Sequence, residues 1–133
     1  MMTEVLVSPD VVLAATSYLR AGLGVLADRV ATEVPSTMPN NMVKLSLTGG
    51  SRTALVQDVA QLTVECWSAN DPTASLLART AHAYMLAAAG VEASGLFVRK
   101  VETVGGVQYF PDPDTNKPRY QFTVRWHVRP ASI

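Results

Sequence analysis

The stretch that decides the fold is Arg119-Tyr120-Gln121-Phe122-Thr123-Val124-Arg125-Trp126-His127-Val128-Arg129. Apolar and polar residues alternate strictly along it. Because side chains in a strand point to opposite faces with a period of two, one face is apolar and the other is polar and cationic. Pro118 and Pro130 flank the stretch, where a missing N–H harms a ladder least. The pattern predicts a half-buried strand whose Tyr120/Trp126 side must be covered by helices.

Composition limits the classes of protein that this chain can belong to. Its 133 residues predict one domain, and the net charge of +0 argues against a protein that binds nucleic acid mainly by charge. A single cysteine, Cys66, excludes an internal disulfide and fits synthesis in a reducing cytoplasm. The N-terminus lacks the basic start of a signal peptide, and no apolar run approaches the ~18 residues of a membrane span. We therefore expect a soluble product with no membrane partner.

Capping signals predict two helices. Ser8-Pro9-Asp10, with Ser8 as N-cap, opens a helix that ends near Arg20 to Ala21, before Gly22 and Gly24. Asn70-Asp71-Pro72 opens a second helix from Pro72 to Ala89, closed by Gly90. One apolar stripe of this second helix suits packing on a sheet; it contains Ala74, Leu77, Ala78, Ala81, Tyr84, Met85 and Ala88. Its other sides are also largely apolar, which predicts a second cover, either the first helix or a neighbouring subunit.

Four further strands are expected before the last one. Their ranges are Val25 to Val34, Met42 to Thr48, Ala60 to Ser68 and Leu96 to Thr103. Gly49-Gly50 is interpreted as a turn, and Ser51 to Asp58 as a long hairpin tip or protruding arm. The order α-β-β-β-α-β-β predicts an α+β fold, with a mainly antiparallel sheet of about five strands covered by two helices.

A search for catalytic, metal and cofactor motifs gives no site. Gly22 to Ala27 matches GxGxxA, but it follows a helix and enters a strand, the reverse of the dinucleotide-binding context. Cys66, His82 and His127 do not stand at metal-ligand spacing, and Cys66 is expected to be an inert core thiol.

Two polar groups have a structural explanation. The loop containing Asp112, Asp114 and Asn116 lacks the glycine and distal glutamate of a calcium loop, so a rigid turn with self-hydrogen bonds is favoured. The cationic face of Arg119, Arg125, His127 and Arg129 could contact nucleic acid, but it is rather expected to meet solvent or cross-strand acids such as Glu65 or Glu102. We expect no cofactor, no metal and no catalytic residue.

Four stretches together resemble the tail terminator (tail completion) proteins of long-tailed bacteriophages with non-contractile tails. They are Val34-Pro35 leading into Val43 to Gly50; Asp58 with Leu62-Thr63-Val64-Glu65-Cys66-Trp67; the Ala-rich helix after Asp71; and Pro111-Asp112-Pro113 with Pro118 to Val124. The similarity spans nearly the whole chain in the same order of elements.

The resemblance implies a structural, non-enzymatic role in the virion, at the neck of the tail. Such proteins form a homohexameric ring on the head-proximal end of the tail tube, stop the addition of tube subunits and present the surface that joins the head connector. Their partners are copies of themselves, the major tail tube protein and the head–tail stopper or connector protein, while DNA only passes through the lumen. For this chain the resemblance implies a subunit or tube interface that involves Gly49, Gly50, Arg52, Asp58, Asp112, Asp114 and Arg119.

Two alternatives remain open from the sequence. One is another neck component, the head–tail stopper or connector, which is also a small ring-forming α+β protein. The other is a small enzyme or ligand-binding domain that uses the Asp112/Asp114 loop and His127. The absence of paired acid–base motifs argues against the second.

Overall fold

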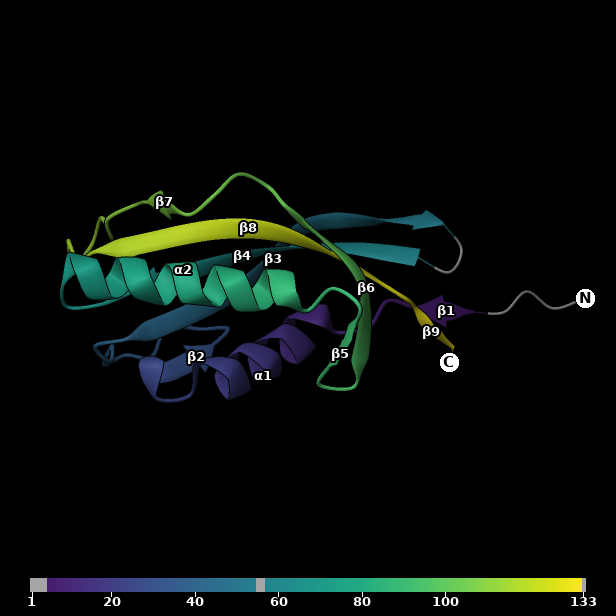
Figure 1. Cartoon of the computed structure of the whole chain (residues 1–133), viewed down its shortest axis with the longest axis horizontal. Helices are drawn as coiled ribbons and strands as arrows, with labels where there is room; N and C mark the ends of the chain where they lie inside the picture. Colours follow the sequence, from purple (N-terminus) through teal and green to yellow (C-terminus); the bar gives the residue numbers. More distant parts are fainter. Residues whose placement is uncertain (1–4, 55–56, 133) are drawn as a thin grey trace, which may run out of the picture.

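Two helices pack on one face of a curved sheet, so the α+β fold predicted from the sequence is confirmed (Figure 1). The structure is a computed structural model that describes residues 5–54 and 57–132. The main sheet has seven strands in the order β2-β3-β4-β8-β6-β5, with β7 paired to β8. It is antiparallel except for the pair β2–β3.

Helix α1 (Val11–Leu23) begins two residues later than its predicted cap suggested. Asp10 is the N-cap, and its carboxylate accepts a hydrogen bond from the Leu13 N–H at 3.0 Å. The assignment of Ser8 as N-cap is wrong, because Asp10 lies closer to the first free N–H groups and carries the better acceptor. The helix ends at Gly24, which has φ 54° and starts a short 3₁₀ turn, η1 (Gly24–Leu26).

Helix α2 (Asp71–Ala87) is capped by Asn70, as predicted, and packs on β8 and β4. Its second cover is helix α1: the Tyr18 hydroxyl donates to the Tyr84 carbonyl at 2.8 Å, and Gly22 lies against the Tyr84 ring. Tyr84 therefore sits at the boundary between the helices and is 37% exposed, although the stripe placed it on the sheet. The other six residues of that stripe are buried: Ala74, Leu77, Ala78, Ala81, Met85 and Ala88.

Strand β8 (Arg119–Val128) is central, between β4 (Gln57–Trp67) and β6 (Leu96–Thr103). The predicted register is confirmed: Trp126 is 0% exposed, and its Nε1–H donates to the Met85 carbonyl of α2 at 3.2 Å. The inward residues of β4 are also buried, Cys66 among them. Alternation along these two strands thus builds the core between the sheet and the helices.

The expected strand from Val25 to Val34 is much shorter. Only β2 (Arg29–Ala31) pairs, parallel to residues Met42–Lys44 of β3. The 3₁₀ turn uses the start of the predicted range, and the weak alternation after Ala31 gives no face to bury.

Short strands not expected from the sequence raise the count above five. β5 (Val91–Ala93) forms a hairpin with β6 through Ser94 and Gly95, both at positive φ. β7 (Gln108–Tyr109) lies in the predicted loop, and β1 (Leu6–Val7) pairs β9 (Ala131–Ser132) in a separate two-stranded sheet.

Gly49-Gly50 is not a turn, because β3 (Met42–Ala54) continues through it and stays paired with β4. A register shift between Leu47 and Gly49 leaves Thr48 as a bulge, and the alternation changes there so that Leu47 and Arg52 face the same side. Gly50 has φ 127°, and a Cβ on it would lie 2.1 Å from the Val59 carbonyl oxygen, so only glycine fits. The glycines therefore serve a bend in the strand.

The ends of β3 and β4 form the predicted protruding arm. We define the hairpin arm as Gly49–Ala54 of β3 with residues 57–60 of β4; it extends beyond the ends of both helices, on the side where β1 and β9 lie (Figure 1).

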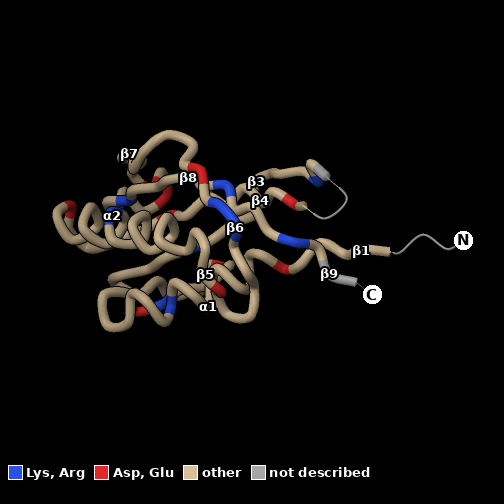
Figure 2. The backbone as a smooth tube through the Cα atoms, turned by 45° about the vertical axis from the view of Figure 1, so that its right-hand side comes forward, with Lys and Arg blue, Asp and Glu red and all other residues tan. Residues whose placement is uncertain are grey.

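Acidic and basic residues are interspersed over the molecule (Figure 2). No helix in residues 5–54 and 57–132 is long and apolar enough to cross a membrane.

Candidate interface sites at the two ends of the sheet

The first candidate site lies on the hairpin arm, around a cross-strand ion pair. Arg52 of β3 stands opposite Asp58 of β4, and its Nε–H donates to Asp58 Oδ1 at 2.9 Å. The Nη2 group of Arg52 also donates to the Leu6 carbonyl at 3.1 Å and to Ser8 Oγ at 3.4 Å. Arg52 therefore ties the segment before α1 to the arm.

Asp58 is buried but only half satisfied. The residue is 6% exposed, and its Oδ2 has no hydrogen-bond partner among the described residues. Burial raises the pKa of this carboxyl, but the hydrogen bond and charge of Arg52, with the nearby Ser8 hydroxyl, outweigh burial and hold the pKa below its ordinary value. A buried carboxylate oxygen without a partner is unusual and marks this end of the sheet as incomplete.

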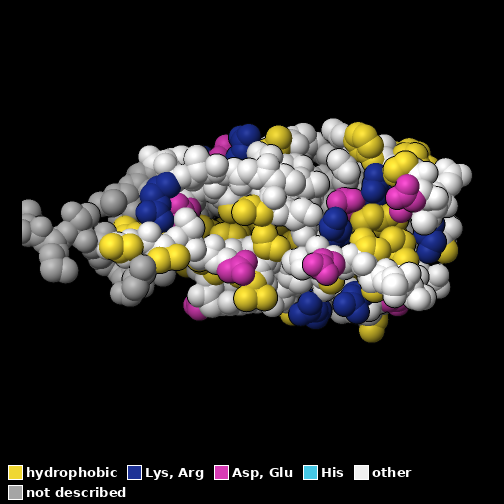
Figure 3. Space-filling model, turned by 180° about the vertical axis from the view of Figure 1, so that it is seen from behind, with side chains coloured by type: hydrophobic (Ala, Val, Ile, Leu, Met, Phe, Trp, Pro, Cys, Tyr) yellow, Lys and Arg dark blue, Asp and Glu magenta, His cyan; other side chains and the backbone are white. Residues whose placement is uncertain are grey.

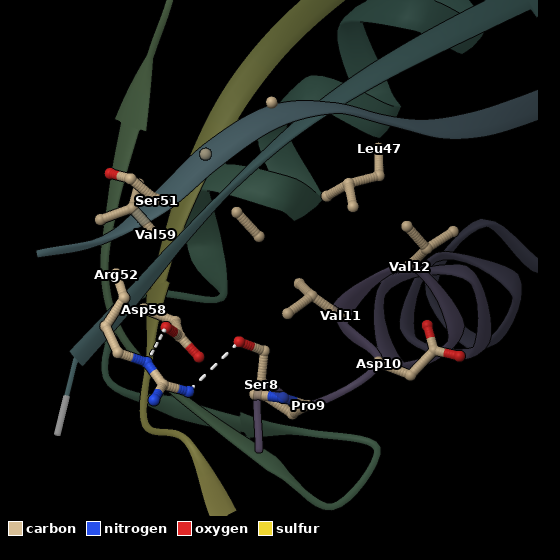
Figure 4. A pocket seen from close by; sticks show the side chains of 13 residues that line it. Ser8, Pro9, Asp10, Val11, Val12, Leu47, Ser51, Arg52, Asp58 and Val59 are labelled. Atoms are coloured by element: carbon tan, nitrogen blue, oxygen red, sulfur yellow. Dashed lines mark hydrogen bonds and ion pairs between the residues drawn. The ribbon is translucent and has the colours of Figure 1, made fainter. Parts of the chain in front are cut away.

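A groove of about 470 Å³ lies beside the pair. It is bordered by the segment Ser8–Val12 on one side and by the arm, from Leu47 to Arg52 and from Asp58 to Ala60, on the other (Figure 4). Leu47 faces the helix side of the sheet, like the fully buried Leu45, yet it is 60% exposed, because α1 begins only at Val11 and leaves this part of the sheet uncovered. Hydrophobic side chains are visible along the middle of this side of the molecule (Figure 3).

The second candidate site lies at the other end of the sheet, around Asp112. Its Oδ2 accepts from Trp67 Nε1 at 3.0 Å, and its Oδ1 accepts from the Asp114 N–H at 2.9 Å. The bond from Asp114 and the bond from Trp67 lower the pKa of Asp112 and outweigh its burial. The loop is thus the self-bonded turn expected from the sequence, with Asp114 exposed and joined to the site only through its backbone.

Arg119 completes this second site. Its Nη1 donates to Glu65 Oε2 at 3.1 Å, its Nε donates to the Phe110 carbonyl at 2.8 Å, and its guanidinium lies 5.4 Å from the centre of the Trp67 ring. Two nitrogens of its guanidinium therefore donate within the chain, and the group also lies near an aromatic ring.

The structure therefore separates the seven predicted interface residues into two groups. Gly49, Gly50, Arg52 and Asp58 lie together on the arm, and Asp112, Asp114 and Arg119 lie together at the loop end. Asp58 and Trp67 mark the two ends of β4, and nine residues at about 3.4 Å each put the groups roughly 30 Å apart. Sequence reasoning missed Leu6, Ser8 and Leu47 at the arm; nothing local signals the first two, whereas Leu47 belonged to a recognised alternation.

The outer face of the sheet behaves as predicted. His127 contacts Glu102, Arg119 contacts Glu65, and Arg125 Nε donates to Gln61 Oε1 at 3.1 Å. The bond to His127 lowers the pKa of Glu102. Arg119, Arg125 and His127 thus make cross-strand contacts with acidic or amide side chains.

The thiol and the metal-ligand candidates of the sequence can be placed in the described part of the chain. Cys66 is fully buried, and burial raises the pKa of its thiol, which leaves it unreactive. Within residues 5–54 and 57–132, no three His, Cys, Asp or Glu side chains could hold a metal ion. His127 pairs with Val59 at the arm end of the sheet, whereas Asp112 belongs to the loop end, so the proposed Asp112/His127 site is not formed.

Comparison with known proteins gives a match of fold. No protein-family model matches the sequence. No curated protein matches it either. Among solved structures, 18 chains match, including a chain of the virion of a native gene transfer agent particle. That chain has 14% identity and a TM-score of 0.63, with 89% of this chain and 95% of that chain covered. The two chains share a fold over nearly their whole lengths.

Proposed function

We propose that this chain is a tail terminator of a long-tailed bacteriophage with a non-contractile tail. In this role it is a structural virion protein of the tail neck, not an enzyme. It caps the head-proximal end of the tail tube as a homohexameric ring, ends tube polymerisation and forms the surface that joins the head. Its partners are its own copies, the major tail tube protein and the head–tail stopper or connector, and DNA passes through its lumen.

The observation that carries this proposal is the shared fold with a chain of a gene transfer agent virion, over 89% of this chain and 95% of that one. Because the match covers both chains almost completely, it supports a structural role in a virion for this chain too. The motifs that resemble tail terminators fall on β3, β4, α2 and β8, which form the core of this fold.

The arrangement of polar groups agrees with a conduit for DNA. Charges are interspersed, the net charge is +0, and Arg119 and Arg125 of the last strand contact Glu65 and Gln61. A strongly basic lumen would retain DNA, because each neutralised phosphate releases counterions and adds affinity.

A head–tail stopper or connector is compatible with the same likeness, so the experiment must separate the two. A terminator covers the open end of a stacked tube, and stacking continues unless that end is closed. In a phage that lacks this chain we expect filled heads beside unattached tails, many of them overlong, in electron micrographs of the lysate. The matched control is the same phage supplied with the chain carrying Arg79→Ala, an exposed change on α2, which should restore joined particles.

The other outcomes point elsewhere. Tails of normal length beside leaking heads would assign the chain to the stopper instead. Complete, joined particles with normal tails would refute a neck role of either kind.

A further inference from the structure

Strand β3 has a long free edge. On the side away from β4 it pairs with β2 only over Met42–Lys44, and in the described part of the chain no strand continues that pairing from Leu45 to Ala54. Residues 47–53 are exposed. A row of unpaired N–H and C=O groups is a template for another strand.

The position next to this edge, where a further strand of the sheet would lie, is not filled by any described strand. β2 ends at Ala31, so no strand of the described residues lies beside β3 from Leu45 onward, and the groove of about 470 Å³ lies over the helix-facing side of the arm, against Ser8–Val12. Leu47 faces the helix side there but is 60% exposed. An extended segment added next to β3 would pair the edge and cover Leu47, which is how β-augmentation gains both hydrogen bonds and apolar burial.

Strand β5, at the opposite edge of the same sheet, offers such a segment at a matching position along the strands. Register partners form one row from Arg52 through Asp58, Val128 and Val98 to Val91 on β5. β5 is the outermost strand on that side. Val91 is 44% exposed there. The two edges therefore meet without a large shift along the strands if copies stand side by side.

Strand direction also fits. From β3 to β4, β8, β6 and β5 each pairing is antiparallel, so β5 runs in the same direction as β3. Rotation of a copy about an axis along the strands preserves that direction and places β5 of one copy parallel to β3 of the next, as β2 already is. Unlike edges joined head to tail form a ring when the rotation closes, whereas two β3 edges joined to each other give a closed two-fold dimer.

Position along the strands and strand direction thus both match between the two edges. We propose that the free edge of β3 binds the β5 edge of a second copy of this chain, so that one sheet continues from subunit to subunit around the ring. This inference rests on the proposed ring and names the edges that close it.

The test is a disulfide cross-link across the two edges. Glu92→Cys is combined with Thr53→Cys in one chain and with Ser51→Cys in another, which covers a shift of two residues along β3. The native thiol Cys66 is fully buried and does not compete. Purified particles that carry each variant are oxidised and run on a denaturing gel, where we expect a ladder of covalent oligomers for at least one of the two combinations.

Two controls decide what a ladder means. Glu92→Cys combined with Arg79→Cys, on the exposed side of α2, should give no ladder. Thr53→Cys and Ser51→Cys alone should also remain monomeric; a dimer from either would show that two β3 edges pair and would overturn the proposal.

The inference and the proposed function can fail separately. Particles that contain the ring by electron microscopy but give no ladder from either combination would overturn the edge pairing and leave the terminator intact. A ladder formed by concentrated free protein, from a chain whose removal leaves joined particles of normal tail length, would support the edge pairing and refute the terminator.

Discussion

The two ends of the sheet each hold a buried aspartate, but the two carboxylates differ in how many of their oxygens accept hydrogen bonds. Asp58 at the arm is 6% exposed and Asp112 at the loop end is 8% exposed. Both oxygens of Asp112 accept a hydrogen bond, from Trp67 and from the Asp114 backbone. Among the described residues only one oxygen of Asp58 does, and Leu47, which lines the same groove, is exposed. The loop end is completed by its own chain, whereas the arm end is completed only in part.

This difference separates stability from recognition. A polar group that is buried and satisfied contributes to the fold, while an unsatisfied one beside an open groove costs free energy in the isolated chain. We therefore expect substitutions at the loop end to change the free energy of unfolding, and substitutions at the arm to change assembly as well.

The largest effect should come from the core that both ends share. Trp126→Ala removes a fully buried ring and its bond to Met85, and we expect it to cost about 3–5 kcal/mol in urea unfolding. Val25→Ala is the control, because Val25 is 97% exposed and its loss should stay within about 0.5 kcal/mol. A cost below about 1 kcal/mol for Trp126→Ala would mean that the ring is not in the core.

Trp126 also shows what the sequence could predict. Strict alternation over ten residues leaves one register that buries the apolar face, and a shift by one residue would expose it. The same holds for β4. The second capping signal was correct because Asn70 accepts from the neighbouring Thr73 N–H and Pro72 has a fixed φ that suits the first turn, so both cause and effect are local.

The arm could not be predicted in the same way. Gly49-Gly50 has the composition of a turn, but whether two glycines turn or bend depends on the partner strand, here the Val59 carbonyl. The hydrogen bond from Arg52 to the Leu6 carbonyl joins residues 46 positions apart in sequence, and no local pattern encodes such a contact. The hairpin of β5 and β6 carried a usable signal, since Ser94-Gly95 is a dipeptide typical of tight turns.

At the loop end, Asp112→Ala should have the next largest effect. The change leaves Trp67 Nε1 without its acceptor and the turn without its cap, so we expect a loss of about 1–3 kcal/mol in urea unfolding. Asp114→Ala, two residues on, is the matched control: its side chain is exposed, and we expect a change within about 0.5 kcal/mol. Equal losses from both would remove the distinction drawn for this loop.

The pH dependence of stability should reflect both aspartates. The pKa of Asp58 and the pKa of Asp112 are lowered in the fold, so each group adds stability that is present above its unfolded pKa of about 3.9 and is lost as the pH falls through the folded value. Unfolding free energy measured by urea from pH 6 to pH 2 should therefore fall in the acid range. Asp112→Asn should flatten that fall, and Asp58→Asn should flatten it further in the double variant. An unchanged slope in the double variant would contradict the role of these carboxylates.

The smallest expected effect is also the sharpest test of the arm. Leu45 and Leu47 lie on the same strand and face the same side of the sheet, but Leu45 is 0% exposed and Leu47 is 60% exposed. Leu45→Ala should cost about 2–5 kcal/mol, because it empties a closed site. Leu47→Ala should stay within about 0.5 kcal/mol in the isolated chain, because the side chain has little cover to lose. If the two substitutions cost the same, the groove is closed in solution and the arm end is as complete as the loop end. If Leu47→Ala is neutral to folding yet reduces incorporation into particles, the missing cover of Leu47 comes from a partner.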